Sequence, residues 1–243
     1  MKIHEHQAKA LFVRYGIPVP NGEVATTPDE TIRAVANLGG RAVVKAQVHA
    51  GGRGKGGGIK VVQSPEEARE FASGLLGKNL ITPQTEPQGV PVNSLLVEEL
   101  AGISRELYVA ITIDRSRCLP VMLASKSGGM DIEAVAASDP AAIHSEAIDP
   151  VLGFMPYQAR RLAARLGLEG PAVGMAGQIM SALYQLFTQL DCSLVEINPL
   201  AVTTGGQLIA LDAKIDLEDD ALFRHPDVQD LADVSQQNAL EVQ

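Results

Sequence analysis

His49-Ala-Gly-Gly-Arg-Gly-Lys-Gly-Gly-Gly58 is a glycine-rich stretch that follows the apolar run Ala42-Val-Val-Lys-Ala46. Six of its ten residues are glycine, and Arg53 and Lys55 are cationic. Glycine accepts positive φ angles and lets backbone N–H groups come close to another molecule, so this loop, with nearby Lys45, suits an anion. The phosphate chain of a nucleotide is the natural candidate.

Two common phosphate-binding motifs do not account for this loop. Residues 52–57 match the dinucleotide fingerprint G-x-G-x-x-G, but that fingerprint opens a helix, and the strand-like run Gly58-Ile-Lys-Val-Val62 follows here. A Walker A loop requires Ser or Thr after Gly-Lys, whereas Lys55 is followed by Gly56. The sequence therefore predicts a glycine loop that joins two adjacent strands. Kinases use a loop in this arrangement to cover the phosphates of ATP. A flexible hairpin tip is the alternative, because polar glycine clusters are common turns.

Composition argues against several classes of protein. The chain has 243 residues, of which 20 are basic and 29 acidic, and its net charge of −9 argues against non-specific nucleic-acid binding. Cys118 and Cys192 lie far apart without metal-type spacing, which favours reduced thiols and a cytosolic setting. The N-terminus lacks the apolar region of a signal peptide, and no apolar run approaches the roughly 20 residues of a membrane helix. We expect a soluble chain with one large or two small domains.

The glycine loop is predicted to lie inside a small α/β lobe formed by residues 21–100. Thr27-Pro-Asp-Glu30 and Ser64-Pro-Glu-Glu67 are capping boxes with proline at the first helical position, so each predicts the start of a helix. The strands on either side of the glycine loop lie between these two helices in the sequence. The strand Ser94-Leu-Leu-Val-Glu98 completes the lobe.

The rest of the chain is predicted to form a second lobe on long strands. Residues 105–114 and 118–124 are β-rich runs joined by a polar turn, which indicates an antiparallel pair. Two later β-rich runs, 193–202 and 207–215, flank a Gly-Gly turn and predict a hairpin. Helical spacing and helix-start signals predict four further helices, at residues 3–15, 131–137, 156–167 and 171–190.

The predicted hairpin carries polar residues in an otherwise apolar pair of strands. Glu196 and Asn198 are two residues apart and share a face, as do Asp212 and Lys214. Asn and Asp are costly to bury unless they bind a group, and a carboxylate beside an amide oxygen suits Mg²⁺ with its phosphate ligands. Counting symmetrically from the glycine turn places Asn198 opposite residue 213, so a bulge near the following proline or a diagonal pairing is required. A hairpin with one solvated face is the alternative.

Two further carboxylates lie on either side of the junction between the predicted lobes. Glu98 ends one lobe, and Glu106 begins the next. A hinge between lobes is a common place to hold a nucleotide base and ribose. Glu98 could accept hydrogen bonds from ribose hydroxyls, and Glu106 could contact the sugar or a metal. Taken singly, each is more often a surface carboxylate.

Several segments in combination resemble a known family. They are Ile3-His-Glu-His-Gln-Ala-Lys9, Lys45-Ala-Gln-Val-His-Ala-Gly-Gly-Arg-Gly-Lys55, Gly128-Gly-Met-Asp-Ile-Glu133, Met155-Pro-Tyr-Gln158, Val195-Glu-Ile-Asn-Pro-Leu200, Leu211-Asp-Ala-Lys214 and Ala221-Leu-Phe-Arg224. Over essentially the whole chain, they resemble the ATP-grasp region of the succinyl-CoA synthetase β subunit. The resemblance implies an α/β (α+β) ATP-grasp fold in which two α/β lobes hold ATP between them.

The resemblance also implies domain boundaries. An ATP-grasp domain would span residues 1–236, with a small lobe at 21–101 and a large lobe formed by 1–20 and 102–236. Residues 237–243 would begin a linker to a C-terminal CoA-ligase domain that family members carry after this region. We therefore expect the chain to be a truncated β subunit that binds nucleotide and is inactive alone.

Roles for individual residues follow from the resemblance. Nucleotide contacts are implied for seven residues: Lys45, Gly52, Arg53, Gly54, Glu98, Ala101 and Glu106. The lysine and the backbone of the glycine loop would hold phosphates, and the two glutamates would bind the nucleoside. Asn198 and Asp212 would carry Mg²⁺. Glu196 resembles the family's glutamate that receives and orients a phosphohistidine loop, which belongs to the partner α subunit.

The implied reaction is the reversible conversion of succinate, CoA and ATP to succinyl-CoA, ADP and phosphate, through a phosphohistidine on the α subunit, which also carries the CoA site. This chain would supply positioning and charge neutralisation for phosphoryl transfer. The implied partners are the α subunit and ATP or ADP, with no nucleic acid or membrane, in the cytoplasm or an organelle matrix. A malate-CoA or other acyl-CoA ligase β subunit, and a nucleotide-binding interaction subunit without catalysis, remain as alternatives.

Overall fold

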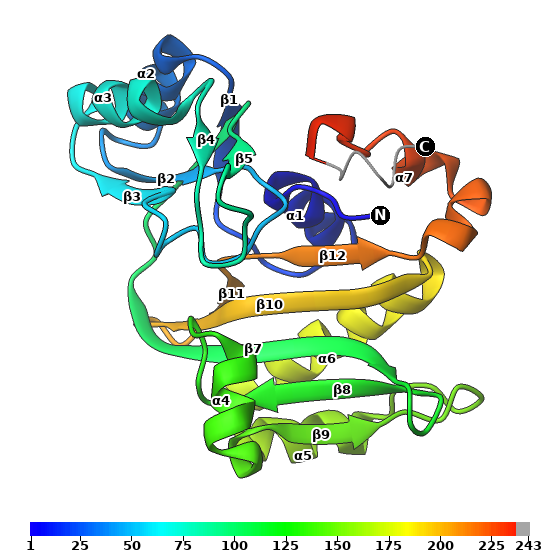
Figure 1. The fold of residues 1–243 in the computed structure, drawn as a ribbon. Coiled ribbons are helices and arrows are strands. Elements are labelled where there is room, and N and C mark those ends of the chain that lie inside the picture. The colour runs from blue at the N-terminus through cyan, green and yellow to red at the C-terminus, as the bar shows by residue number, and fades with distance from the viewer. Residues whose placement is uncertain (237–243) are drawn as a thin grey trace. The chain divides into compact units, whose positions relative to one another are not determined.

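The structure is a computed structural model that describes residues 1–236 (Figure 1). The chain divides into two compact units. Unit 1 comprises Met1–Val19 and Gly102–Ala232, and unit 2 comprises Pro20–Ala101 together with residues 233–236. Both units combine helices with antiparallel strands, so the predicted α/β (α+β) class is confirmed.

The division differs from the expected lobes at two places. Pro20 and residues 233–236 were expected in the large lobe, and both belong to unit 2 instead. Side-chain contacts explain the second difference, because Gln236 Nε2 donates to the carbonyl of Pro91 at 2.8 Å. The expected linker at 237–243 lies outside the described residues.

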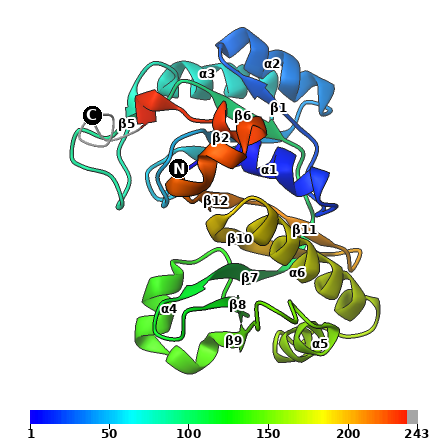
Figure 2. The ribbon, with the colours of Figure 1, turned by 90° about the vertical axis from the view of Figure 1, so that its right-hand side faces the viewer.

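Unit 2 is built on a four-stranded antiparallel sheet with the strand order β1-β6-β2-β3. Its strands are β1 (Gly22–Ala25), β2 (Ala42–Ala46), β3 (Ile59–Val62) and β6 (Leu95–Glu98). The helices α2 (Pro28–Asn37) and α3 (Pro65–Leu75) lie side by side and pack against these strands (Figure 2). A two-stranded ribbon is formed by β4 (Asn79–Leu80) and β5 (Val90–Pro91), and the short 3-10 helix η3 (Val234–Gln236) contacts β5.

Both helices of unit 2 begin where the capping boxes predict. The hydroxyl of Thr27 accepts the N–H of Glu30 at 3.2 Å, and the hydroxyl of Ser64 accepts the N–H of Glu67 at 3.2 Å. Each contact satisfies a backbone donor that the first turn of a helix leaves unpaired. The caps fix where the helices start, and their buried alanine and valine residues pack into the core of the unit.

Unit 1 is built on a larger antiparallel sheet with the strand order β11-β10-β7-β8-β9, in which β12 also pairs with β10. Its strands are β7 (Ile103–Asp114), β8 (Leu119–Ser125), β9 (His144–Ala147), β10 (Cys192–Thr203), β11 (Leu208–Ala210) and β12 (Lys214–Leu217). Its helices are α1 (Glu5–Arg14), α4 (Ile132–Ser138), α5 (Pro156–Arg165), α6 (Pro171–Gln189) and α7 (Pro226–Gln229), with 3-10 turns η1 (Pro140–Ala142) and η2 (Asp219–Arg224).

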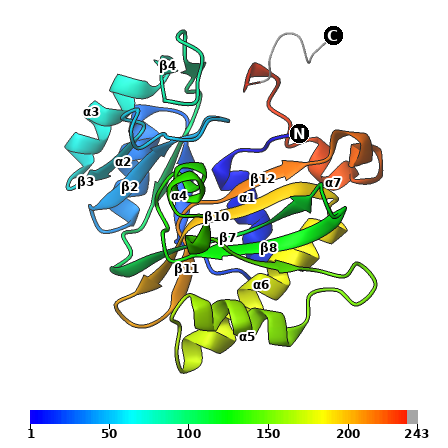
Figure 3. The same ribbon diagram turned by 60° about the horizontal axis from the view of Figure 1, so that its bottom comes forward.

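Two helices cover one face of this sheet. Figure 3 shows α5 and α6 next to each other below the strands, and both contact the sheet and one another. Leu162, Met180, Leu183 and Leu186 of these helices are fully buried against the central strands. No helix within the part of the chain that the structure describes is long and apolar enough to cross a membrane.

The predicted hairpin after residue 193 is present, but its returning strand is interrupted. The prediction of one strand over residues 207–215 is wrong, because β11 ends at Ala210 and β12 begins at Lys214. Glu196 pairs with Lys214, and Leu200 pairs with Ala210. If either pairing is extended into the gap, it gives the same pair of opposite positions: the residue two after Glu196 and the residue two before Lys214.

The aligned positions are Asn198 and Asp212, so the symmetric count that placed Asn198 opposite residue 213 is wrong. A register shift does lie near Pro199, but it is in the pairing of β10 with β7, between Ile197 and Leu200. The break at residues 211–213 allows Asp212 to lie level with Asn198 without a ladder pair between them. The common register on the two sides of the break therefore brings the two predicted metal ligands level with each other.

Candidate functional site

The glycine loop forms a compact turn between two paired strands. Strands β2 and β3 pair antiparallel on either side of it, which confirms the predicted strand–loop–strand arrangement. Within the loop, the N–H of Gly56 donates to the carbonyl of Gly52 at 3.0 Å, and the N–H of Gly58 donates to that of Arg53 at 2.8 Å. These internal hydrogen bonds define the course of the loop.

The two cations of the loop have different environments. The side chain of Arg53 is buried, and its Nη1 donates to the carbonyl of Ala46 at 3.0 Å, which ties the turn to the end of β2. Lys55 is exposed, and the N–H groups of Gly54 and Lys55 donate to no other residue within 1–236. Exposed consecutive amides are suited to an anion, so Arg53 supports the turn while the backbone after it offers donors.

The substitution Gly56→Ala is expected to destabilise the chain by about 1–3 kcal/mol, because the new methyl group overpacks a filled position. A Cβ atom at Gly56 would lie 2.5 Å from the backbone carbonyl oxygen of Ile81. Gly54→Ala is the matched control, because a Cβ atom there has no neighbour within 4 Å. Urea unfolding of both variants measures the difference. Equal losses of stability in the two would contradict the close approach of the loop to Ile81.

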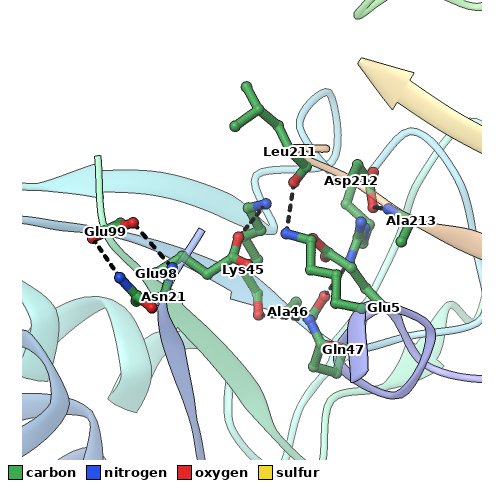
Figure 4. A network of polar contacts seen from close by, with 12 residues as sticks. Glu5, Asn21, Lys45, Ala46, Gln47, Glu98, Glu99, Leu211, Asp212 and Ala213 are labelled. Carbon is green, nitrogen blue, oxygen red and sulfur yellow. Dashed lines mark hydrogen bonds and ion pairs between the residues drawn. The ribbon is translucent and has the colours of Figure 1, made fainter. Parts of the chain in front are cut away.

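A buried ion pair joins two predicted nucleotide contacts in unit 2. Lys45 of β2 and Glu98 of the neighbouring β6 are 2.6 Å apart from Nζ to Oε2, and their side chains are 9% and 2% exposed (Figure 4). Close approach requires a glycine opposite, because a Cβ atom at Gly22 would lie 2.8 Å from Cγ of Glu98. Ala101 is half-buried in the segment that follows β6. Gly22 is a residue that the sequence patterns did not single out.

Asn198 holds a second glycine loop in unit 1. Its Oδ1 accepts the N–H of Gly129 at 2.8 Å, and its Nδ2 donates to the carbonyl of Met130 at 2.9 Å. The same loop meets the predicted nucleoside contact Glu106, whose carbonyl accepts the N–H of Gly128 at 3.2 Å. The sequence analysis placed this glycine pair in a segment of the family resemblance without a role of its own, so its contacts with Asn198 and Glu106 were missed.

The two glycines of this loop are sterically required. A Cβ atom at Gly128 would lie 2.4–2.5 Å from backbone atoms of Leu107. One at Gly129, where φ is +70°, would lie 2.4 Å from Oε2 of Glu106. A side chain at either position would push the loop away from β7 and from Asn198.

The donor set at the hairpin fits Mg²⁺. Asn198 and Asp212 present hard oxygen atoms at aligned positions, and Oδ1 of Asp212 accepts the N–H of Ala213 at 2.8 Å, which orients the carboxylate. Among residues 1–236, no group of three or more His, Cys, Asp or Glu side chains is arranged to hold a metal ion. An ion here would take its remaining ligands from phosphate oxygens and water, which is the usual arrangement for Mg²⁺ with a nucleotide.

Glu196 lies in an environment that disfavours its charge. Its Oε2 accepts a hydrogen bond from the hydroxyl of the buried Tyr108 at 3.1 Å. Burial raises the pKa of Glu196, the charges of Asp212 and Glu133 add to the rise, and Lys214 and the Tyr108 hydroxyl act in the opposite direction. Burial, with the nearby carboxylate, also raises the pKa of Tyr108, which therefore stays a hydrogen-bond donor. Tyr108 is a further residue that the sequence patterns missed.

The predicted site residues are divided between the units. Unit 2 carries Lys45, Gly52, Arg53, Gly54, Glu98 and Ala101. Unit 1 carries Glu106, Glu196, Asn198 and Asp212. In unit 2 these residues lie on the glycine turn, on the neighbouring strands β2 and β6 and just after β6, and in unit 1 they lie on β7 and on the broken hairpin.

Comparison with known proteins gives consistent matches. The family model described as an ATP-grasp domain matches residues 2–202. The succinate–CoA ligase [ADP-forming] subunit beta of Persephonella marina is 51% identical over 243 residues, which are 100% of this chain and 63% of that protein. The protein of the same name from Thioalkalivibrio sulfidiphilus is 52% identical over 99% of this chain and 63% of its own length. The chain therefore spans less than two thirds of these relatives.

A solved structure shares the fold. The dinucleotide-forming acetyl-coenzyme A synthetase 1 of Ca. Korarchaeum cryptofilum superposes with a TM-score of 0.66 and 20% identity, over 89% of this chain and 93% of that one. That protein was solved with coenzyme A, acetyl-coenzyme A and a phosphorylated phosphohistidine segment. At this level of identity the likeness establishes the fold alone.

Proposed function

The chain belongs to the ATP-grasp family, and on that premise we propose that it is the nucleotide-binding part of the β subunit of an ADP-forming succinate–CoA ligase. Identity of 51% across all 243 residues carries the proposal. The reaction is succinate, CoA and ATP giving succinyl-CoA, ADP and phosphate. The chain spans only 63% of the length of that relative. The activity is therefore proposed for the complete subunit, of which this chain would be the nucleotide-binding part.

The proposal assigns nucleotide contacts to residues in each of the two units. The contacts are Lys45, the backbone of Gly52, Arg53 and Gly54, and the side chains or backbone of Glu98, Ala101 and Glu106. The exposed amides after Arg53 support the phosphate assignment, since neutral donors at a turn attract anions. The ion pair of Lys45 with Glu98 supports the phosphate assignment of the lysine. A nucleotide phosphate would compete with the Glu98 carboxylate for the ammonium group of Lys45.

Asn198 and Asp212 would hold Mg²⁺ bound to the nucleotide. The aligned registers of β10 with β11 and β12 support this assignment. When bound, the ion neutralises charge on the phosphate oxygens during phosphoryl transfer. The contacts of Asn198 with Gly129 and Met130 would hold its amide in a fixed orientation toward the ion.

Glu196 would receive the histidine of a partner α subunit, which carries the CoA site. In the direction of ATP synthesis, the bond between phosphorus and the histidine nitrogen breaks, and a bond forms to a terminal oxygen of ADP. The carboxylate of Glu196 would orient the imidazole ring and balance its charge, and Tyr108 would hold that carboxylate. We propose that this reaction takes place in the cytoplasm or in an organelle matrix.

Two experiments test the proposal. The first measures binding of Mg·ADP and Mg·GDP to the chain, and we expect Mg·ADP to bind. If neither nucleotide binds, the proposal is contradicted. The second assembles the complete subunit with its partner and compares succinate with malate as the acid. Preferential use of malate would favour the related malate-CoA ligase, and nucleotide binding without turnover of either acid would favour a non-catalytic interaction subunit.

A further inference from the structure

The break in the returning strand of the hairpin is held by a buried lysine from the first helix. Nζ of Lys9 donates to the backbone carbonyl of Leu211 at 2.8 Å. Leu211 is the first residue after β11, and it directly precedes Asp212. Figure 4 shows the carbonyl of Leu211 and the carboxylate of Glu5 in the same polar network.

Lys9 is itself held in place by its own helix. Glu5, one turn earlier in α1, forms an ion pair with Nζ at 2.9 Å, and the side chains of Lys9 and Glu5 are 5% and 2% exposed. The helix is anchored by Leu11 and Phe12, which are buried in the core of unit 1. A buried ammonium group is unfavourable unless it is fully paired, so its placement against this backbone carbonyl points to a requirement for that carbonyl's position.

The backbone of the break is fixed from two sides. The N–H of Leu211 donates to the carbonyl of Pro199 at 3.1 Å, so this group is tied to β10 directly after Asn198. The carbonyl of Leu211 is tied to Lys9 in α1. Its two polar groups therefore point to different elements, which sets the orientation of the peptide between Leu211 and Asp212 and so the place of the Asp212 backbone.

We propose that Lys9 is a positioning residue that fixes the strand break so that Asp212 can serve as a ligand of the nucleotide-bound Mg²⁺. This inference rests on the proposed function, because it concerns the metal ligand assigned there. Lys9 acts through the peptide between Leu211 and Asp212, and Glu5 keeps the ammonium group aimed at it.

The test compares binding of ADP with and without Mg²⁺ in the wild-type chain and in Lys9→Met, which removes the ammonium group and keeps the length of the side chain. We expect Mg·ADP to bind about tenfold more weakly in the variant, because a charged hydrogen bond that orients a ligand is lost. Binding of ADP in the presence of EDTA should change less than twofold. Glu5→Gln, which leaves the lysine in place, should give a smaller change in the same direction.

Arg161→Met is the matched control for stability. It breaks the ion pair of α5 with the buried Glu146 of β9, within the same unit. A loss of Mg·ADP affinity in Arg161→Met equal to that in Lys9→Met would show that general destabilisation is responsible, and would overturn the inference. The inference would also be overturned if the effect of Mg²⁺ on ADP affinity in Lys9→Met equalled that in wild type. If Lys9→Met does not fold, the same comparison is made with Glu5→Gln. Failure of the wild-type chain to bind Mg·ADP would instead contradict the proposed function, on which this inference depends.

Discussion

The substitution Lys45→Met is expected to lower the free energy of unfolding by about 3–5 kcal/mol, because it leaves the Glu98 carboxylate buried without its ammonium partner. The two side chains are 9% and 2% exposed, and their charged atoms are 2.6 Å apart. Urea unfolding at neutral pH measures the loss. Lys60→Met is the matched control in the same unit, because the side chains of its pair with Glu67 are 41% and 30% exposed and solvent-accessible pairs contribute about 0–1 kcal/mol.

A second substitution separates stability from binding. The double variant Lys45→Met with Glu98→Leu removes both buried charges, and we expect it to recover most of the lost stability. It should not recover binding of Mg·ADP, because the cation assigned to the phosphates is still absent and the assigned nucleoside contact Glu98 is removed as well. Two results would contradict this picture: a loss in Lys45→Met no larger than in Lys60→Met, or full nucleotide affinity in the double variant.

The substitution Glu196→Gln is expected to slow transfer of the phosphoryl group from the partner's histidine to ADP by about a hundredfold or more, in the complete subunit assembled with its partner. The carboxylate is poised by the hydroxyl of Tyr108, and glutamine keeps the shape of the side chain while removing the charge that would face the imidazole ring. Single-turnover transfer of labelled phosphate measures the rate. Binding of Mg·ADP to the variant should stay within about twofold of wild type.

An exposed carboxylate provides the control for this prediction. Glu169→Gln changes an exposed residue of the same unit and is expected to leave the transfer rate unchanged. Because burial raises the pKa of Glu196, the variant should also be no less stable than wild type at neutral pH. A transfer rate in Glu196→Gln equal to that of Glu169→Gln would exclude the assigned role.

Much of the fold could be predicted from local sequence signals. The hydroxyl groups of Thr27 and Ser64 cap α2 and α3 as their spacing predicts. The glycine loop after Ala46 joins paired strands, since the runs on either side are apolar and short. These features depend on residues close together in the chain, which is why pattern and spacing were sufficient.

The rest depended on contacts between distant residues. The burial of Arg53 is an exception, because its guanidinium contacts the carbonyl of Ala46 only seven positions earlier, yet no pattern predicts that the turn folds back on β2. The pairing of Glu196 with Tyr108 joins residues 88 positions apart. The carbonyl of Leu211, at the interruption, accepts a hydrogen bond from Lys9, which is 202 positions away. No periodicity in the sequence encodes such contacts. The symmetric count failed for a local reason, because the pairing of Val202 with Leu208 centres the turn on Gly205 and not between the two glycines.

Isothermal titration of Mg·ADP into the wild-type chain and into the Asp212→Ala variant tests the nucleotide and metal site most directly. Wild type is expected to bind, and the variant is expected to bind at least about tenfold more weakly with Mg²⁺ present, because one of two protein ligands of the ion is removed. In EDTA the two proteins should bind ADP with similar affinity. Equal affinities for Mg·ADP in the two proteins would contradict the assignment of Asp212 as a metal ligand. Absence of binding to wild type would contradict the proposed function.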